Sequence, residues 1–299
     1  MPHLRIEQIA PKLGRLEDNL RLHADLLAKA SEEGVDLLVF PELSLTGYLL
    51  KDLVSEVAQG SETLLNRLRA ATPSVRNLEA AIGFVEESPG HRFHNSTLVV
   101  RWDERAVPSV VHIHRKVYLP TYGLFDEGRY FTPGKTLRTF ETQCLGRCGI
   151  LICEDAWHLS LPLLLALDGP RLEGAGALII PSNSPARGVG EAAQGIPESY
   201  RIWDRLLATY ATLLEVCVIY AGRGGVEDGL TFSGGSQVIS PTGESLGKAK
   251  HFESDRLDVT LDWPGLLRMA RASSLVSASE NVDLLKRELE RIAIRGVDC

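Results

Sequence analysis

The chain has 299 residues, of which 44% are hydrophobic and 24% are charged, and its formal net charge is -7. This composition is that of an ordinary globular protein and argues against a disordered chain or a membrane protein. The acidic balance also argues against a nucleic-acid partner, because proteins that bind nucleic acid concentrate positive charge. These observations favour a protein that acts on a small molecule.

Neither the N-terminal sequence nor the number of cysteines suggests a secreted protein. The first residues, MPHLRIEQIAPKLGRLEDN, contain no apolar stretch of the kind found in secretory signals, and no apolar run reaches the length of a membrane-spanning helix. The five cysteines are an odd number, which does not suggest a disulfide framework. We therefore expect a cytoplasmic protein that has no membrane partner.

The first predicted elements are a helix and a strand. Residues 16–29 carry leucines at helical spacing, which predicts an amphipathic helix, and Gly34 follows where a helix would end. Residues 35–40 then form a continuous apolar run that Pro41 terminates, which is typical of a strand covered on both faces. The pattern of alternating helices and strands continues to the end of the chain.

The later elements follow in the same way. They are a helix at 61–71, a strand at 80–85, a hairpin-like pair at 95–102 and 107–114, a strand at 149–153, a helix at 161–166, a strand at 177–181, a helix at 203–215, a strand at 216–221, a hairpin at 236–240 and 244–249, and a final helix at 284–294. No linker divides the chain, so we predict a single α/β domain over residues 1–299.

Two segments of similar sequence pattern stand in different halves of the chain. GVDLLVFPE at 34–42 and GAGALIIPSNS at 174–184 each run from glycine through an apolar strand to proline and a polar residue. They indicate either two pseudo-symmetric halves or two examples of a common helix-to-strand junction. Both interpretations stay open at the level of sequence.

Three reactive side chains follow predicted strands. Glu42, Lys116 and Cys153 are far apart in the sequence, and ligands in α/β folds bind at the carboxyl ends of strands. A thiol becomes nucleophilic beside a base or a cation, and the backbone N–H of Glu154 could face a developing oxyanion. Taken singly, each also has an ordinary structural explanation, as a buried cysteine, a capping carboxylate or a surface lysine.

The surroundings of these residues form three blocks in a fixed order. The blocks are FPEL at 40–43 with TGY at 46–48, HRKVYLP at 114–120 and GILICEDAW at 149–157. They resemble the glutamate, lysine and cysteine blocks of the nitrilase, or carbon–nitrogen hydrolase, superfamily. The resemblance covers nearly the whole chain and includes a second glutamate, Glu127, within FDEGRYF at 125–131.

This resemblance implies a fold and a mechanism. The fold would be a four-layer α-β-β-α sandwich that assembles as a homo-oligomer, with 274–299 as a C-terminal extension that could reach a partner subunit. Cys153 would be the nucleophile, Glu42 the base and Lys116 the oxyanion stabiliser, while Glu127 would orient the lysine or the attacking group. The chemistry would need no cofactor and no metal.

The implied activity is hydrolysis of a non-peptide C–N bond in a small linear amide, through a cysteine thioester. Residues 116–131, KVYLPTYGLFDEGRYF, also resemble the amidase domain of glutamine-dependent NAD synthetases, so a glutaminase that supplies ammonia to a separate synthetase is an alternative. A nitrilase is less favoured, and a non-catalytic binding protein on the same fold is the alternative of a different class. The candidate substrate-pocket residues, each of which could instead serve packing, are Tyr48, Tyr122, Phe125, Trp157 and Ser184.

Two other interpretations are disfavoured. His112, His114, Cys144 and Cys148 could suggest zinc, but the spacing of the two cysteines is unusual and no second well-spaced pair accompanies them. A Cys–His hydrolase using His112 or His158 would lack any matching sequence signature.

Overall fold

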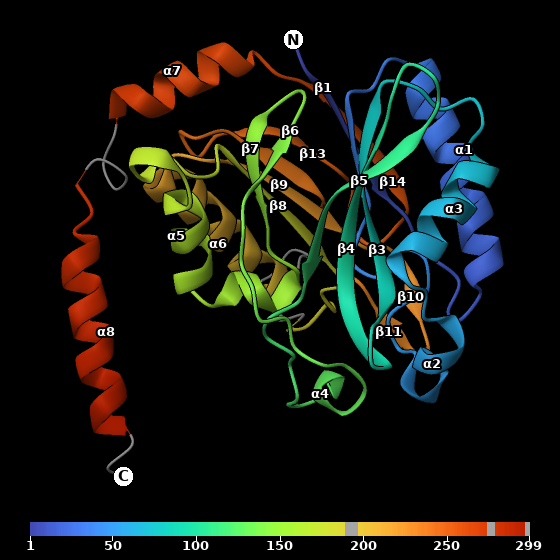
Figure 1. The fold of residues 1–299 in the computed structure, drawn as a ribbon, viewed down its shortest axis with the longest axis horizontal. Helices are drawn as coiled ribbons and strands as arrows, with labels where there is room; N and C mark the ends of the chain where they lie inside the picture. The colour runs from blue at the N-terminus through green and yellow to red at the C-terminus, as the bar shows by residue number, and fades with distance from the viewer. Residues whose placement is uncertain (189–196, 274–278, 297–299) are drawn as a thin grey trace.

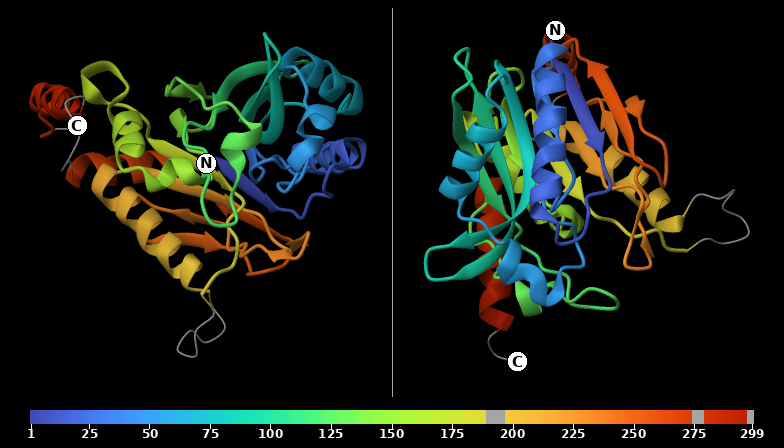
Figure 2. Two further views of the ribbon diagram at one scale, coloured as in Figure 1. Left: turned by 90° about the horizontal axis from the view of Figure 1, so that it is seen from below. Right: turned by 90° about the vertical axis from the view of Figure 1, so that its right-hand side faces the viewer.

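The fold consists of two β-sheets packed face to face, with helices on both outer faces (Figure 1). The computed structural model describes residues 1–188, 197–273 and 279–296. Each of the two main sheets has six strands, and a small two-stranded ribbon is formed by β10 (Val226–Glu227) and β11 (Leu230–Thr231). The predicted four-layer α-β-β-α sandwich is confirmed (Figure 2).

The first sheet has the order β14-β1-β2-β3-β4-β5. Its strands are β1 (His3–Gln8), β2 (Leu37–Val39), β3 (Leu78–Ser88), β4 (Arg92–Trp102), β5 (Pro108–Arg115) and β14 (Asp255–Thr260). Strands β1, β2 and β3 are parallel, and the others join antiparallel. Helices α1 (Leu16–Glu32) and α3 (Ser61–Ala71) supply leucines to the core that covers the outer face of this sheet.

The second sheet has the order β13-β12-β9-β8-β7-β6. Its strands are β6 (Phe140–Thr142), β7 (Gly146–Ile150), β8 (Ala177–Ser182), β9 (Cys217–Gly222), β12 (Gln237–Ile239) and β13 (Ser245–Lys248). Strands β7, β8 and β9 are parallel. Helices α5 (Ser160–Leu167) and α6 (Glu198–Leu214) pack on its outer face.

The two similar sequence segments occupy matching places. GVDLLVFPE contains β2, which lies between β1 and β3, and GAGALIIPSNS contains β8, which lies between β7 and β9. Each is therefore the middle strand of a parallel triplet, and each carries its polar residues beyond the carboxyl end. This placement favours the pseudo-symmetric interpretation.

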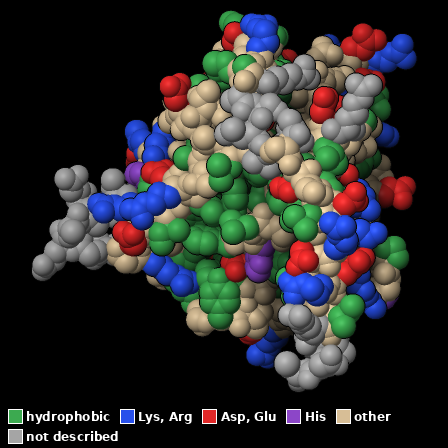
Figure 3. All heavy atoms as spheres, turned by 90° about the vertical axis from the view of Figure 1, so that its left-hand side faces the viewer, with side chains coloured by type: hydrophobic (Ala, Val, Ile, Leu, Met, Phe, Trp, Pro, Cys, Tyr) green, Lys and Arg blue, Asp and Glu red, His purple; other side chains and the backbone are tan. Residues whose placement is uncertain are grey.

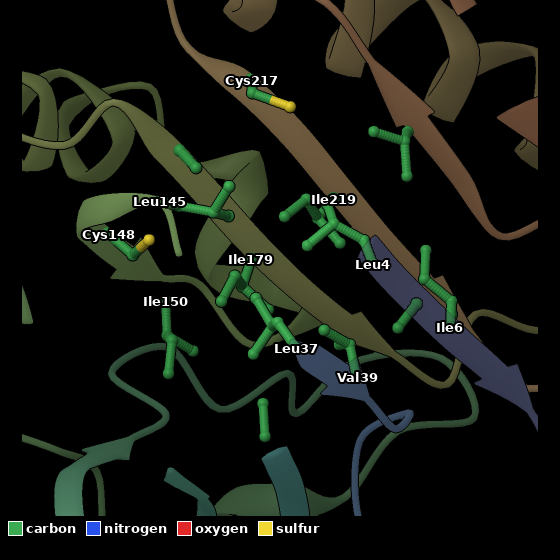
Figure 4. Close-up of a cluster of buried hydrophobic side chains, with 14 of the residues drawn as sticks. Leu4, Ile6, Leu37, Val39, Leu145, Cys148, Ile150, Ile179, Cys217 and Ile219 are labelled. Carbon is green, nitrogen blue, oxygen red and sulfur yellow. The ribbon is translucent and has the colours of Figure 1, made fainter. Parts of the chain in front are cut away.

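The inner faces of the two sheets form the central core (Figure 4). Leu4, Leu37 and Val39 from the first sheet meet Ile179 and Ile219 from the second. All five side chains are buried, and full burial of such a side chain stabilises a protein by about 1.5–3 kcal/mol. This apolar layer fixes the distance between the sheets, and so the geometry of any site built from both.

The sequence pattern did not reveal the strands β1 and β14. Their charged residues form ion pairs across the two strands, with Arg5 Nε 2.7 Å from Asp258 Oδ1 and Arg256 Nε 2.6 Å from Glu7 Oε1. Such pairs let charged residues alternate with apolar ones on a covered strand. The prediction of a strand over 149–153 is also wrong at its end, because β7 stops at Ile150 and Cys153 begins the 3-10 helix η2 (Cys153–Trp157).

The remaining helices complete the described chain. They are η1 (Lys51–Leu53), α2 (Val54–Val57), α4 (Glu127–Tyr130), η3 (Pro170–Leu172), α7 (Trp263–Ser273) and α8 (Val282–Gly296). Helix α8 stands apart from the sandwich (Figure 1), and the predicted extension over 274–299 has 274–278 and 297–299 outside the described residues. Among the described helices, none combines the length and apolar character needed to cross a bilayer.

Candidate active site

Glu42 lies in the turn that follows β2, where the backbone approaches β3 closely. Gly83 of β3 faces this turn, and a Cβ atom there would lie only 2.3 Å from the backbone nitrogen of Leu43. The Glu42 side chain is fully buried, and its Oε1 accepts a hydrogen bond of 2.7 Å from Asn95 Nδ2, while its Oε2 accepts one of 2.8 Å from Asn183 N. These donors hold the carboxylate in a single orientation.

Lys116 follows the last residue of β5 and lies between two carboxylates. Its Nζ donates a 2.7 Å hydrogen bond to Glu42 Oε1 and another of 2.7 Å to Glu127 Oε1. Burial alone would lower the pKa of Lys116, but the charges of Glu127 and Glu42 raise that pKa well above its ordinary value. The side chain is therefore a permanent ammonium ion in a site closed to solvent.

Glu127 is the first residue of α4, and it is held from two sides. Its Oε1 accepts hydrogen bonds of 2.7 Å from both Lys116 Nζ and the hydroxyl of Tyr48. Its Oε2 is buried and has no hydrogen-bond partner among the described residues. Burial raises the pKa of Glu127 to about 7, because the charge of Lys116 offsets only part of the desolvation.

Cys153 begins the turn that leads from β7 into η2, and its backbone has a positive φ of 46°. For a residue with a side chain this conformation costs roughly 1–2 kcal/mol, and such strain is concentrated at functional sites. The Ser182 hydroxyl donates to Sγ over 3.3 Å. Burial and the charge of Glu42 raise the pKa of the thiol, while Lys116 opposes this, so the resting group is a protonated thiol that needs a base.

Asp155 ties the cysteine turn to the lysine strand. Its Oδ1 accepts from the backbone nitrogens of Val117 and Tyr118, each over 2.9 Å. Its Oδ2 accepts from Ile152 N over 3.1 Å and lies 3.0 Å from His114 Nε2. The side chain is fully buried, so this one carboxylate fixes the position of Cys153 relative to Lys116.

A pocket of about 320 Å³ opens above Cys153. Its lining combines aromatic side chains with charges of both signs: Tyr122, Phe125, Cys153, Glu154, Trp157, Ser184, Pro185, Arg187, Gly188, Glu198, Ser199, Ile202 and Trp203. The guanidinium of Arg187 lies 4.7 Å from the centre of the Phe125 ring, and the Tyr122 hydroxyl donates to the Glu154 carboxylate over 3.0 Å. The volume is that of a small-molecule site.

The structure brings most of the predicted site residues together. Glu42, Lys116 and Glu127 are hydrogen-bonded to one another through Lys116 Nζ, and their charges act on the Cys153 thiol. The predicted wall residues Tyr122, Phe125, Trp157 and Ser184 line the pocket with Cys153, as does Glu154. Tyr48 is not among the residues that line this pocket; it is buried, and its hydroxyl donates to Glu127 Oε1 over 2.7 Å.

Sequence reasoning missed four residues that position this site: Asn95, Asp155, Ser182 and Asn183. Asn95 is a polar residue within the buried strand β4, and Ser182 and Asn183 follow directly after an apolar run. A polar residue in such a place needs a buried partner, which is a signal that the sequence offers.

The histidines considered as alternatives have other neighbours. His158 stacks on the Tyr118 ring, with 3.3 Å between ring centres, and His112 stacks on Phe140 at 4.7 Å. His114 is paired with Asp155. Within the part of the chain that the structure describes, no group of three or more potential metal ligands is found.

The decisive observation is that Glu42, Lys116 and Cys153 lie close together beside one pocket. The sequence model of the carbon–nitrogen hydrolase family matches residues 4–268. The chain belongs to this family. Its resemblance to glutamine-dependent NAD synthetases is confirmed as well: the enzyme of that name from Thermotoga maritima is 33% identical over 276 residues, which are 90% of this chain and 44% of that protein.

Solved structures show the same relationship in three dimensions. The glutamine-dependent NAD+ synthetase of Acinetobacter baumannii superposes with a TM-score of 0.72 at 27% identity, over 86% of this chain and 44% of that one. A carbon–nitrogen hydrolase from Helicobacter pylori G27 gives a TM-score of 0.81 at 23% identity, over 96% and 98% of the two chains. This member of the carbon–nitrogen hydrolase family thus spans less than half the length of the synthetases that it matches.

Proposed function

We propose that this carbon–nitrogen hydrolase cleaves the side-chain amide of a zwitterionic amino acid such as glutamine and releases ammonia. The observation that carries the proposal is the position of Lys116, whose ammonium lies between Glu42 and Glu127 beside the Cys153 thiol. A fixed cation at that place can stabilise the negative charge that develops on a carbonyl oxygen under attack.

In the first half of the proposed reaction, Glu42 accepts the thiol proton as Cys153 Sγ attacks the carbonyl carbon. The oxyanion is stabilised by Lys116 Nζ and by the backbone N–H of Glu154, and one such donor is typically worth about 2.7–4 kcal/mol. The tetrahedral adduct collapses, the C–N bond breaks, and Glu42 returns the proton to the departing ammonia. A thioester on Cys153 remains.

In the second half, water replaces ammonia in the pocket. Glu42 takes one proton from this water as its oxygen attacks the thioester carbon, and the same donors stabilise the second oxyanion. The C–S bond then breaks, the carboxylic acid leaves, and the proton on Glu42 restores the thiol. Ser182, whose hydroxyl donates to Sγ, supports the sulfur as its negative charge returns.

The charges in the pocket support the amino-acid substrate. Arg187 lines one part of the pocket and could bind a carboxylate, whereas Glu154 and Glu198 could bind an ammonium group. A neutral amide would offer neither a carboxylate to Arg187 nor an ammonium group to Glu154 and Glu198. A small apolar amide is the second candidate, because Trp157, Ile202 and Trp203 give the pocket an apolar part as well.

Ammonia release from glutamine and from butanamide separates the two candidates. We expect glutamine to be preferred, and Arg187→Met to raise KM for glutamine while leaving that for butanamide nearly unchanged. Cys153→Ala is the control for the mechanism and should abolish release from either compound. Equal activity of this variant and the wild type would contradict the cysteine mechanism. No release from any amide, together with an unreactive thiol, would favour a non-catalytic binding protein.

A separate synthetase that receives the ammonia is proposed as a partner. Its support is that relatives named glutamine-dependent NAD synthetases match most of this chain, the Thermotoga maritima protein over 90% of it. Glutamine hydrolysis is measured with and without an ammonia-dependent NAD synthetase. A rise in rate that depends on the synthetase supports this partner, and an unchanged rate with no NAD formed from glutamine contradicts it.

We also propose that the chain forms a homo-oligomer. Apolar side chains gather at the centre of the face seen in Figure 3. Large apolar side chains are also exposed on η2, α5 and α6 and on the link between η2 and α5. They are Trp157, Leu159, Leu164, Ile202 and Leu213. Contiguous apolar surface of this kind is typical of a subunit interface. Light scattering after size-exclusion chromatography tests this, and a monomer at micromolar concentration would contradict it.

A further inference from the structure

A second polar pocket, of about 410 Å³, lies away from Cys153. One wall is the turn between β3 and β4, and the other is the segment 132–136 that follows α4. The residues that line it are Ser88, Pro89, Gly90, Arg92, His94, Arg115, Thr132, Pro133, Gly134, Lys135 and Thr136. We refer to this set as the cationic pocket.

Positive charge dominates the cationic pocket, although the chain as a whole is acidic. Arg92 and Lys135 are exposed, and neither forms an ion pair with any residue that the structure describes. Arg115 is neutralised by Glu86, to which its Nε and Nη2 donate over 2.8 and 2.6 Å. The positive charges of Arg92 and Lys135 therefore have no counter-ion among the described residues.

A buried histidine joins the two walls of the cationic pocket. His94 Nδ1 lies 2.7 Å from the carbonyl oxygen of Thr132, and His94 Nε2 lies 3.0 Å from Ser88 Oγ. Since a carbonyl can only accept, Nδ1 donates to Thr132, and a neutral ring then accepts from the Ser88 hydroxyl. Burial lowers the pKa of His94, so the ring is neutral near pH 7.

The same wall contacts the backbone of the catalytic lysine. Gly134 N donates to the carbonyl oxygen of Lys116 over 2.7 Å, and Thr132 N donates to Phe93 O over 2.7 Å. Only glycine fits at position 134, because a Cβ atom would lie 2.2 Å from the Arg115 carbonyl oxygen.

We propose that the cationic pocket binds the phosphoryl group of a small phosphorylated metabolite. A guanidinium and an ammonium that face one cavity match the charge of a phosphate, and the hydroxyl of Thr136 adds a neutral donor. The volume lies in the range of small-molecule sites, so it has room for a sugar beside the phosphate. This proposal is independent of the amidase activity and of its substrate.

Calorimetric titration at constant ionic strength tests the proposal with two probes, inorganic phosphate and ribose 5-phosphate, and with chloride as the control anion. We expect saturable binding of ribose 5-phosphate, and Arg92→Ala and Lys135→Ala should each weaken it about tenfold or more. Arg105→Ala removes a cation that is 82% exposed elsewhere on the surface, so this matched control should bind as the wild type does.

The outcomes separate the sources of the phosphoryl group. Tighter binding of ribose 5-phosphate than of phosphate identifies a phosphorylated metabolite, and equal binding identifies free phosphate as the occupant of the same site. Melting temperatures of the variants, measured without anion, show whether they fold. The absence of binding by either probe, or binding that the two pocket variants and Arg105→Ala weaken equally, would overturn the proposal.

Discussion

Replacing Asp155 with asparagine tests how the segment that carries Cys153 is held to the segment that carries Lys116. The carboxylate accepts from three backbone N–H groups, two on Oδ1 and one on Oδ2, and it pairs with His114. In Asp155→Asn the amide group keeps one oxygen, so its nitrogen must face the N–H of Ile152 or those of Val117 and Tyr118. At least one buried N–H then lacks an acceptor.

The expected cost follows from these contacts. A buried donor without a partner costs about 1–3 kcal/mol, and the remaining bonds lose the benefit of an ionised acceptor. We therefore expect the free energy of unfolding to fall by roughly 2–4 kcal/mol. The turn at Cys153 also becomes free to shift relative to Lys116, and a displacement of about 1 Å can reduce catalysis about 100-fold.

Urea unfolding and the kcat/KM for ammonia release measure the two effects. Asp168→Asn is a matched control, because Asp168 Oδ2 accepts from Thr139 N over 2.8 Å and from Thr139 Oγ1 over 3.1 Å, and an asparagine oxygen can take over both bonds. This control should retain wild-type activity. The reasoning is refuted if Asp155→Asn unfolds within about 0.5 kcal/mol of the wild type and keeps its activity.

Three further predictions concern other parts of the molecule. Glu127 loses its charge as the pH falls through about 7, so kcat/KM should decline below that pH. In the pH–rate profile of Glu127→Gln this acidic decline should be absent, and the maximal kcat/KM should be lower by about tenfold or more. Burial lowers the pKa of His23 from 6.5 to about 4. The unfolded chain therefore takes up a proton first as the pH falls, and this histidine should reduce the free energy of unfolding by up to about 3 kcal/mol between pH 6.5 and 4. Urea unfolding at pH 7 and 5 should show a smaller loss in His23→Leu than in the wild type, and an equal loss would contradict this assignment. Helix α8 exposes Leu289 and Ile292 by 65% and 56%, so removal of 274–299 should lower the oligomeric mass in light scattering; an unchanged mass would assign the subunit contact to other elements.

The sequence predicts the helices and covered strands because their apolar residues follow a clear period. Glu42, Lys116 and Cys153 could be found because they follow such strands inside blocks that resemble a known family. Asp155 could not be assigned a role, because a carboxylate in a short helix has the same sequence pattern whether it is solvated or buried. Strands β1 and β14 were missed for a related reason, as their charges are satisfied by pairs that form only across the sheet.

The order of strands in the first sheet has a consequence for synthesis of the protein. Strand β14, the last strand of the described chain, pairs with β1, the first. An emerging polypeptide can thus close this sheet only after more than 250 residues have been translated. Pairing of β1 with β14 should therefore be a late step of folding during synthesis, and a truncated chain that lacks β14 would leave one edge of β1 without its partner strand.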